Sequence, residues 1–412
     1  MSVSASNAGS ASPVVIVGAG QAGVEAAAAL RESGYEGSIS LVGAEPHVPY
    51  ERPPLSKQYL EPDADAGSLV LRGADFYQDR GIELLLGTAA TRIDRGQRAV
   101  VLASGERLPY ARLILAPGAT PRRLPVPGAN HPSVLTLRTL DESDALRARL
   151  LAAPQRVVVI GGGFIGLEVA AAARAAGHDV TVVEALDRVL ARAVSLPISK
   201  YMAALHRDRG VRILFDRQVE AIDGEPGGAL YDLRLRGGAI LPADLVVVGV
   251  GVTPDTALAE QAGLTVADGI VVDEYLRTGD PLIHAVGDCA RFPSPHGAGL
   301  LRLESVQNAV DQARCVAQYI CDGEAAKPYG AVPWFWTDQY ADKLQIAGIT
   351  TGHDRVELDG DPAEASFSVH CYRGDRLVGV ESVNRPIDHI RARRKLAQPV
   401  PAAADETVAR AA

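Results

Sequence analysis

Three features of the sequence predict a fold of the α/β class with two parallel-sheet domains and a smaller third domain of the α+β type. A strand–glycine–helix pattern occurs twice, at residues 14–30 and 157–173, and the two copies start 143 residues apart. Short alternating segments follow each copy, as is typical of an antiparallel meander. From about residue 331 the sequence changes to alternating strands, and this part contains both tryptophans. We therefore expect two units of one design and a separate C-terminal domain.

The two copies share one arrangement of glycines. They read VVIVGAGQAGVEAAAAL and VVVIGGGFIGLEVAAAA, so G-x-G-x-x-G lies between an apolar strand and an alanine-rich helix in each. The glycines are Gly18, Gly20 and Gly23 in the first copy and Gly161, Gly163 and Gly166 in the second. In a Rossmann-like unit the first glycine makes the tight turn, the second lets the backbone approach a pyrophosphate, and the third brings helix and strand together. Two such units predict two bound dinucleotides and a relay of electrons between them.

Acidic residues stand where such units need them. Glu45 ends the segment ISLVGAE and Glu184 ends VTVVE, each at the end of the second strand of its unit. A carboxylate about 20 residues after the glycines accepts a hydrogen bond from a ribose 2′-hydroxyl. Further on, the apolar strand in TGDPLIHAVGDCARF runs into Gly287-Asp288. Asp288 is thus expected at the carboxyl edge of a parallel sheet, where it can accept from a sugar-alcohol hydroxyl.

Charge and composition restrict the class of protein. The formal net charge of −9 argues against nucleic acid as a partner. The first 13 residues have neither the charged region nor the apolar region of a signal peptide. The longest apolar run is the second glycine motif itself, which Glu168 interrupts, so we expect no membrane span. The sequence predicts a cytoplasmic protein.

The four cysteines show no pattern of a redox pair or a metal site. No C-x-x-C or C-x4-C spacing occurs in the sequence. Cys315 and Cys321 are six residues apart on a predicted helix, which places them about 240° apart around its axis. They therefore cannot face each other, and we interpret the cysteines as small apolar residues of the interior.

The remaining elements follow in order along the chain. Residues 44–60 form a charged, proline-stiffened loop in which Arg52 and Lys57 are candidates to reach a cofactor, with a solvated turn as the alternative. Residues 82–117 predict a small antiparallel meander that returns to the parallel sheet. Residues 138–152 predict a helix capped near Thr139. After the second unit we expect a helix around residues 195–209, a short strand and a second meander.

Several long motifs, in a fixed order, carry a family resemblance. They are VPYERPPLSK, LRTLDESDAL, GGGFIGLEVA, ADLVVVGVGVTP, AVGDCARF, ESVQNAVDQARCVA and PWFWTDQY. With them the chain resembles FAD-dependent ferredoxin reductases of the putidaredoxin reductase type, in the pyridine nucleotide-disulfide oxidoreductase superfamily. The resemblance implies a glutathione-reductase-like architecture and electron transfer from NADH through FAD to a [2Fe–2S] or other small ferredoxin. That ferredoxin would serve a haem-thiolate monooxygenase or a Rieske dioxygenase.

The resemblance also implies a division into domains. An N-terminal tail, residues 1–12, is expected to be disordered. The FAD-binding domain would comprise residues 13–121 and 247–330, and the NAD-binding domain residues 122–246. Residues 331–412 would form the C-terminal interface domain.

Site residues follow from the resemblance, position by position. The first unit would hold FAD and the second NADH, with the following cofactor-binding residues: Gly18, Ala19, Gly20, Ala22, Gly23, Glu45, Arg52, Lys57, Ala90, Arg138, Asp288 and Val306 for FAD, and Gly161, Gly163, Gly166 and Glu184 for NADH. Trp336 would lie against the flavin ring. Glu168 would orient the nicotinamide ring, or alternatively be a helix carboxylate held by local hydrogen bonds. Two positions depart from the family pattern, because Ala116-Pro117-Gly118 replaces its alanine-threonine-glycine and Ala44 replaces an aspartate of some relatives.

Docking of a ferredoxin requires a local basic face on an acidic protein. Arg72 and Arg314 are the candidates that the resemblance places near the ferredoxin side. The alternative is that both are ordinary surface arginines.

Two other functions share this scaffold. A disulfide reductase or thiol-dependent oxidase would need a cysteine in the loop at residues 43–60, and that loop has none. An apoptosis-inducing-factor type of flavoprotein would use NADH to switch a binding surface, and rapid turnover that depends on a partner separates it from a reductase. Hydride transfer from NADH to a flavin needs placement of the two rings rather than an acid, a base or a nucleophile.

Overall fold

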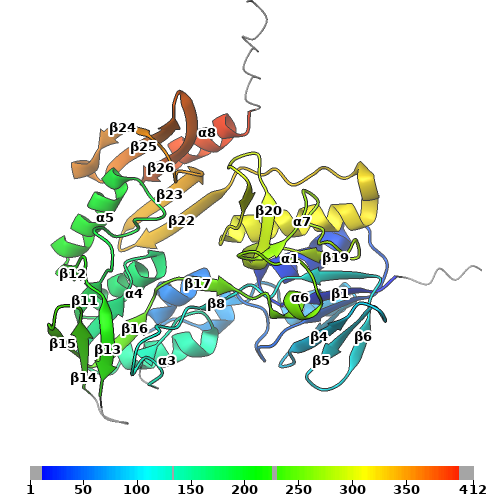
Figure 1. The fold of residues 1–412 in the computed structure, drawn as a ribbon, viewed down its shortest axis with the longest axis horizontal. Helices are drawn as coiled ribbons and strands as arrows, with labels where there is room; N and C mark the ends of the chain where they lie inside the picture. The colour runs from blue at the N-terminus through cyan, green and yellow to red at the C-terminus, as the bar shows by residue number, and fades with distance from the viewer. Residues whose placement is uncertain (1–11, 132–133, 225–229, 399–412) are drawn as a thin grey trace, which may run out of the picture.

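The computed structural model describes residues 12–131, 134–224 and 230–398. Except for residue 12, the N-terminal tail predicted at residues 1–12 lies outside these ranges. Figure 1 shows two α/β lobes side by side and an antiparallel sheet with its helix next to the second lobe. The chain builds most of the first lobe, crosses to the second, returns to the first and ends in the antiparallel domain.

The first lobe contains a five-stranded parallel sheet in the order β19-β7-β1-β2-β3. Its strands are β1 (Val14–Val17), β2 (Ile39–Val42), β3 (Ile82–Leu85), β7 (Arg112–Leu115) and β19 (Ile283–Ala285). The central strand β1 is apolar and buried at all four positions, as expected for a parallel sheet covered on both faces. Helices α1 (Gln21–Glu32) and α7 (Val306–Asp322) pack against each other beside it. Strand β19 enters this sheet after the second lobe is complete.

The second lobe repeats the plan with a parallel sheet in the order β12-β11-β10-β16-β9. Its strands are β9 (Val134–Leu135), β10 (Arg156–Ile160), β11 (Asp179–Val183), β12 (Arg212–Leu214) and β16 (Leu245–Val248). Its helices are α3 (Leu140–Leu150), α4 (Phe164–Ala175) and α5 (Leu196–Asp208). The helix predicted at residues 138–152 is confirmed, and Thr139 caps it in a capping box with Glu142.

Each lobe carries a three-stranded antiparallel meander. The first is β4 (Ala90–Asp94), β5 (Ala99–Leu102) and β6 (Arg107–Pro109); the second is β13 (Val219–Asp223), β14 (Tyr231–Leu235) and β15 (Ile240–Ala243). Both meanders were expected, but the first begins later than predicted. Residues 82–85 form β3, the edge strand of the parallel sheet, and their alternating pattern reflects an edge with partly exposed side chains.

The C-terminal domain is an antiparallel sheet in the order β22-β23-β26-β25-β24 with one helix. Its elements are β22 (Trp334–Gln339), β23 (Asp342–Gly348), β24 (Arg355–Asp361), β25 (Ser366–Arg373), β26 (Arg376–Val383) and α8 (Pro386–Leu396). Valines and Phe367 of this sheet share one apolar core with the second lobe. The sheet therefore packs on the second lobe instead of standing apart from it.

Shorter elements link these parts. Strands β8 (Ala119–Pro121) and β17 (Val252–Pro254) pair where the chain passes between the lobes. The others are α2 (Ala74–Asp79), α6 (Ala257–Gln261), β18 (Ile270–Val271), β20 (Ala290–Pro293), β21 (Leu300–Leu301) and the 3-10 turns η1 (Pro53–Ser56), η2 (Gln58–Leu60), η3 (Ala66–Leu69), η4 (Gly287–Cys289), η5 (Gly323–Ala325) and η6 (Pro362–Glu364). Of the helices that the structure describes, none has the length and apolar character to cross a membrane.

Candidate functional site

The first glycine of each motif makes the same tight turn. Gly18 has φ +111° and Gly161 has φ +105°, a backbone region that favours glycine. A Cβ atom on Gly18 would lie 2.0 Å from the carbonyl oxygen of Ala116, and one on Gly161 would lie 2.4 Å from that of Gly249. Each turn therefore packs against the residue that follows a neighbouring strand of its parallel sheet. This residue is Ala116, after β7, in the first lobe and Gly249, after β16, in the second.

The third glycine brings each helix close to its strand. A Cβ on Gly23 would lie 1.8 Å from the oxygen of Gly18, and one on Gly166 would lie 2.1 Å from the oxygen of Gly161. No side chain fits at either position without moving the backbone. The first and third glycines are thus explained by packing within the protein.

The second glycine of each motif is different, because no contact among the described residues requires it. Within the described ranges, a Cβ on Gly20 would meet no atom within 4 Å, and the nearest atom to one on Gly163 would be 3.9 Å away. Both residues are N-caps, of α1 and α4, and neither helix has a side-chain cap. By contrast α3 and α7 are capped by Thr139 and Ser305. The open space and uncapped N–H groups fit a phosphate at each helix N-terminus.

Asp288 and Val306 lie near the first glycine motif. Asp288 is in η4, directly after β19, and a Cβ on the adjacent Gly287 would lie 3.2 Å from the Cβ of Ala22 in α1. The Gly287 amide donates to Gln312 of α7 over 2.7 Å. Val306 begins α7. Residues far apart in sequence therefore converge at one end of the first sheet.

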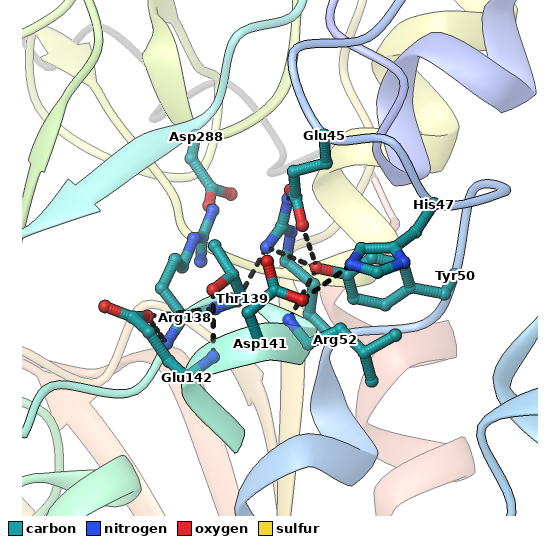
Figure 2. Close-up of polar contacts among 10 residues, drawn as sticks. Glu45, His47, Tyr50, Arg52, Arg138, Thr139, Asp141, Glu142 and Asp288 are labelled. Atoms are coloured by element: carbon teal, nitrogen blue, oxygen red, sulfur yellow. Dashed lines mark hydrogen bonds and ion pairs between the residues drawn. The ribbon is translucent and has the colours of Figure 1, made fainter. Parts of the chain in front are cut away.

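Arg138 and Asp288 form an ion pair, with Arg138 Nη2 2.8 Å from Asp288 Oδ2. Figure 2 shows the two side chains meeting across the gap between their segments. Both side chains are largely shielded from solvent, at 25% and 16% exposure. Two residues expected to contact one cofactor are thus brought into direct contact with each other.

Glu45 lies in a polar cluster with Tyr50 and Arg52, shown in Figure 2. Arg52 Nη2 donates to Glu45 Oε1 over 2.6 Å, and the Tyr50 hydroxyl donates to the other carboxylate oxygen. Burial raises the pKa of Tyr50, so its hydroxyl stays protonated as a donor. Sequence reasoning missed Tyr50, although it stands between the two residues that it joins.

This cluster is tied to the start of α3. Arg52 Nη1 donates to the carbonyl of Arg138 over 2.6 Å, and the Tyr50 oxygen accepts from the amide of Leu140 over 2.9 Å. His47 lies 2.7 Å from Asp141 in the same region. The proline-stiffened loop is therefore anchored against the segment that leads into the second lobe, instead of being a free solvated turn.

Lys57 and Glu168 meet where all three parts of the molecule join. Lys57 Nζ lies 3.0 Å from Glu168 Oε1, with side-chain exposures of 13% and 2%. Ser56 donates to Glu168 Oε2 and Thr337 to Oε1, each over 2.5 Å. Sequence reasoning missed Ser56 and Thr337, whose only signal was adjacency to Lys57 and Trp336. Glu168 is thus held by hydrogen bonds from η1 and from β22 of the C-terminal domain.

Trp336 lies in the same strand, β22. Its ring lies 5.6 Å from that of Trp334, centroid to centroid, and both are partly exposed. The amide of Trp334 donates to Gln307 of α7 over 3.0 Å. Strand β22 is thereby fixed beside the N-terminus of α7, which brings Trp336 to the region of Val306 and Glu168.

Glu184 directly follows β11 and supports the second glycine loop. Its Oε2 accepts from the amide of Gly162 over 2.7 Å, and its Oε1 accepts from the amide of Leu186 over 2.8 Å. It is half-buried. Arg188 points its donors back into the loop, to the carbonyls of Ala191 and Val194 at 2.7 and 3.1 Å.

The remaining predicted residues are Ala19, Ala90, Arg72 and Arg314. Ala19 is in the first glycine loop, and Ala90 begins β4. Arg72 is exposed and lies over the ring of Phe76 at 5.6 Å. Arg314 is 60% exposed, and its Nε donates to the nearly buried carboxylate of Glu25 in α1 over 2.6 Å.

The cysteines are all free thiols, and none is exposed. Cys289 stands next to Asp288 but is completely buried, and burial raises the pKa of its thiol to about 12. Burial likewise raises the pKa of Cys315 to about 11. Thiols with such pKa values are not nucleophiles near neutral pH. In the described ranges no group of three histidine, cysteine or acidic side chains is arranged to hold a metal.

Comparison with protein families finds two that together span most of the chain. The family described as pyridine nucleotide-disulphide oxidoreductase matches residues 12–313. The family described as reductase C-terminal matches residues 334–411.

The similar proteins reported below are all named as reductases. The chain is 51% identical to rhodocoxin reductase of Rhodococcus erythropolis over 94% of its length and 90% of that protein. Among solved structures, the ferredoxin reductase for the CYP199A2 system from Rhodopseudomonas palustris is similar with TM-score 0.89 and 50% identity, over 92% of this chain and 93% of that one. The covalent putidaredoxin reductase–putidaredoxin complex is similar with TM-score 0.89 and 44% identity, over 93% of each chain.

Proposed function

The chain belongs to the pyridine nucleotide-disulphide oxidoreductase family, and from this premise we propose that it is the reductase of an oxygenase system. It takes two electrons from NADH and passes them through FAD, one at a time, to a ferredoxin. The relatives include a putidaredoxin reductase of Pseudomonas putida and the ferredoxin–NAD(+) reductase component of a dioxygenase system. A flavin supplies the needed chemistry, because it accepts a hydride and releases electrons singly. The apoptosis-inducing-factor type of function is not favoured by these relatives.

The observation that carries the proposal is the pair of open spaces at Gly20 and Gly163. Each lies at an uncapped helix N-terminus, and the two arrangements agree in turn, strand and helix. A single site would serve an enzyme that uses one dinucleotide. Two sites on one chain suit a relay in which NADH binds to one lobe and FAD to the other.

We assign FAD to the first lobe and NADH to the second. In the first lobe, the loop of Gly18, Gly20 and Gly23 would hold the pyrophosphate of FAD. Asp288 and the N-terminus of α7 at Val306 would face the flavin half of the cofactor, with its sugar alcohol. The ion pair between Arg138 and Asp288 supports this, because it places a cation and a hydrogen-bond acceptor together where a polar chain would pass. The domain division at residues 13–121, 122–246, 247–330 and 331–412 belongs to the same proposal.

Glu45 has a more indirect role in this proposal than the sequence indicated. Its carboxylate is already engaged by Arg52 and Tyr50. It would therefore orient the Arg52 guanidinium toward the cofactor, with a remaining lone pair for a ribose hydroxyl. In the second lobe, Glu184 would accept from the ribose of NADH while it holds the glycine loop.

Lys57, Glu168 and Trp336 would surround the place where nicotinamide and flavin meet. Glu168 is fixed from three sides by Lys57, Ser56 and Thr337, so its carboxylate has one orientation. A fixed carboxylate can position the carboxamide of a nicotinamide. No proton transfer is needed from these side chains, since the hydride passes directly between rings.

Docking of the ferredoxin would use the exposed arginines Arg72 and Arg314. The α7–α8 side of the molecule adds Arg393, which lies 4.7 Å over the ring of Trp334, and Arg394 beside it in a groove of about 400 Å³. Arg314, Arg393 and Arg394 would give a protein of net charge −9 a local basic region on α7 and α8, where Asp311 lies as well. An acidic ferredoxin, of the [2Fe–2S] or another small type, would complement this region.

The proposed function is tested with purified holoenzyme under anaerobic conditions. NADH is expected to bleach the flavin absorbance, and oxidised [2Fe–2S] ferredoxin to restore it. A [4Fe–4S] ferredoxin in a parallel assay tests the choice of cluster. The cytoplasmic location remains a proposal that fractionation of producing cells would test.

A further inference from the structure

A buried carboxylate of the C-terminal domain contacts the second lobe directly. Glu381 lies in β26, and both of its oxygens accept from the backbone amide of Ser195, over 2.9 and 3.1 Å. The Ser195 hydroxyl donates to one of the same oxygens. Both residues are 0% exposed. Burial of a carboxylate is costly and raises the pKa of Glu381, so this contact needs a physical reason.

Part of the reason is the N-terminus of α5. Ser195 is the N-cap of this helix, but its side chain makes no capping hydrogen bond. Serine at an N-cap ordinarily accepts from an amide of its own first turn. Here the hydroxyl is directed to Glu381 instead, and the carboxylate lies where the helix dipole favours negative charge. The local preference is overridden in favour of a contact between domains.

The segment held in this way is the loop at residues 185–194, which joins Glu184 to α5. Thr350 of the C-terminal domain adds a second contact, to the carbonyl of Ala193 over 3.3 Å. Ser199 Oγ donates to the carbonyl of Val189 over 2.6 Å. The loop is therefore fixed at its C-terminal end by two contacts to another domain, and at Val189 by one contact to α5.

The middle of the loop, at Val189 and Leu190, lies against the second glycine motif. Leu190 has φ +53°, a strained conformation for a leucine, and is 4% exposed. Its amide donates to the carbonyl of Gly162 over 2.9 Å, and a Cβ on Gly162 would meet Val189 at 3.0 Å. Glu184 holds the amide of the same glycine. Strain of this kind persists only where surrounding contacts enforce it.

We propose that Glu381 is a positioning residue for NADH, which acts through Ser195 and the loop at residues 185–194 to hold Gly162 and Glu184 in place for the adenosine half of the dinucleotide. The inference rests on the proposed function, because it takes the second lobe as the NADH site. It assigns to the C-terminal domain a part in nucleotide recognition in addition to any contact with the flavin or the ferredoxin.

The test compares Glu381→Gln and Ser195→Ala with the wild-type holoenzyme. Glu357→Gln is the matched control, since Glu357 is an exposed carboxylate in the same sheet. Loss of a buried hydrogen bond is expected to raise both the KM for NADH and the dissociation constant of ADP-ribose, measured by calorimetry, roughly tenfold. The kcat at saturating NADH, the flavin content and kcat/KM with reduced nicotinamide mononucleotide, which lacks the adenosine half, should stay near the wild-type values.

Two results would overturn the inference. ADP-ribose binding that is unchanged in both variants would show that Glu381 does not act on the nucleotide. Equal losses with NADH and with the mononucleotide would show a general structural effect. If Glu381→Gln fails to accumulate, Ser195→Ala decides, because it removes only the hydroxyl contact. Failure of the proposed function itself looks different, since the wild-type holoenzyme would then fail to reduce a ferredoxin with NADH, whatever the two variants do.

Discussion

Glu168 Oε1 lies 3.0 Å from Lys57 Nζ, although one residue is in α4 of the second lobe and the other follows η1 in the first. Both side chains are nearly inaccessible to solvent. Ser56 and Thr337 complete the hydrogen bonds of the carboxylate. This pair joins the lobes at the place where the two cofactor rings are expected to meet. Breaking it should therefore lower both the stability of the protein and its rate of turnover.

Removal of the positive charge of Lys57 should therefore lower the free energy of unfolding. Lys57→Met leaves Glu168 buried without its cation, a change that typically costs about 3–5 kcal/mol. We expect a clearly lower melting temperature of the holoenzyme and slower reduction of flavin by NADH. The double variant Lys57→Met/Glu168→Gln should recover most of the lost stability. A double variant as unstable as Lys57→Met alone would show that the pair does not couple the lobes.

The second glycines of the motifs provide a matched pair of variants. Gly20→Val and Gly163→Val both place a Cβ atom in open space, where it does not clash with the protein itself. Gly20→Val should yield colourless protein, because its side chain blocks the approach of a pyrophosphate. Gly163→Val should keep its flavin and lose NADH binding. Full flavin content in Gly20→Val, measured by absorbance, would reverse or remove the assignment of FAD to the first lobe.

Glu184 should control the choice between NADH and NADPH. A carboxylate there accepts from a 2′-hydroxyl and repels a 2′-phosphate, so NADH should be strongly preferred. Glu184→Ala should reduce the ratio of kcat/KM for NADH to kcat/KM for NADPH, mainly by lowering kcat/KM for NADH. The reason is that the variant also loses the hydrogen bond from the Gly162 amide.

Arg188 serves as the control in that experiment. Its guanidinium already donates to two carbonyls of its own loop. Arg188→Ala is therefore expected to leave the ratio of kcat/KM values for the two nucleotides nearly unchanged. Comparable efficiency of the wild-type enzyme with NADH and NADPH would contradict the role of Glu184.

A substitution of Arg314 distinguishes an effect on ferredoxin docking from an effect on electron transfer within the enzyme. Arg314→Gln should weaken ferredoxin reduction and flatten its dependence on salt, whereas reduction of a small neutral quinone stays near normal. Charges at the rim of an interface act mainly on the association rate, with a Debye length of about 8 Å at physiological ionic strength. The glutamine variant is preferable to glutamate, because a second carboxylate would face Glu25. Equal loss with both acceptors would assign Arg314 to the α1–α7 contact alone.

Local features of the site could be predicted from sequence because each depends on neighbouring residues. The glycine turns, the capping box at Thr139 and the position of Asp288 after an apolar strand are of this kind. Each is set by backbone geometry or by hydrogen bonds within a few residues. The same local patterns assigned residues 82–85 to the meander, whereas they form β3 at the edge of the parallel sheet. An alternating pattern does not distinguish these two kinds of strand.

Contacts between distant segments could not be predicted in this way. Nothing near Glu168 indicates that Ser56 and Thr337 will donate to it, and nothing near Ser195 indicates Glu381. These contacts depend on how the lobes and the C-terminal domain pack. The pairing of Arg314 with Glu25 likewise depends on the crossing of α1 and α7.

The central claim is that electrons pass from NADH through FAD to a ferredoxin, and one measurement tests it most directly. Purified holoenzyme is mixed with NADH and oxidised [2Fe–2S] ferredoxin without oxygen, and both absorbance changes are followed together. The account predicts two ferredoxins reduced for each NADH consumed, with little NADH consumed when ferredoxin is omitted. NADH binding without ferredoxin reduction, across a panel of ferredoxins, would contradict it.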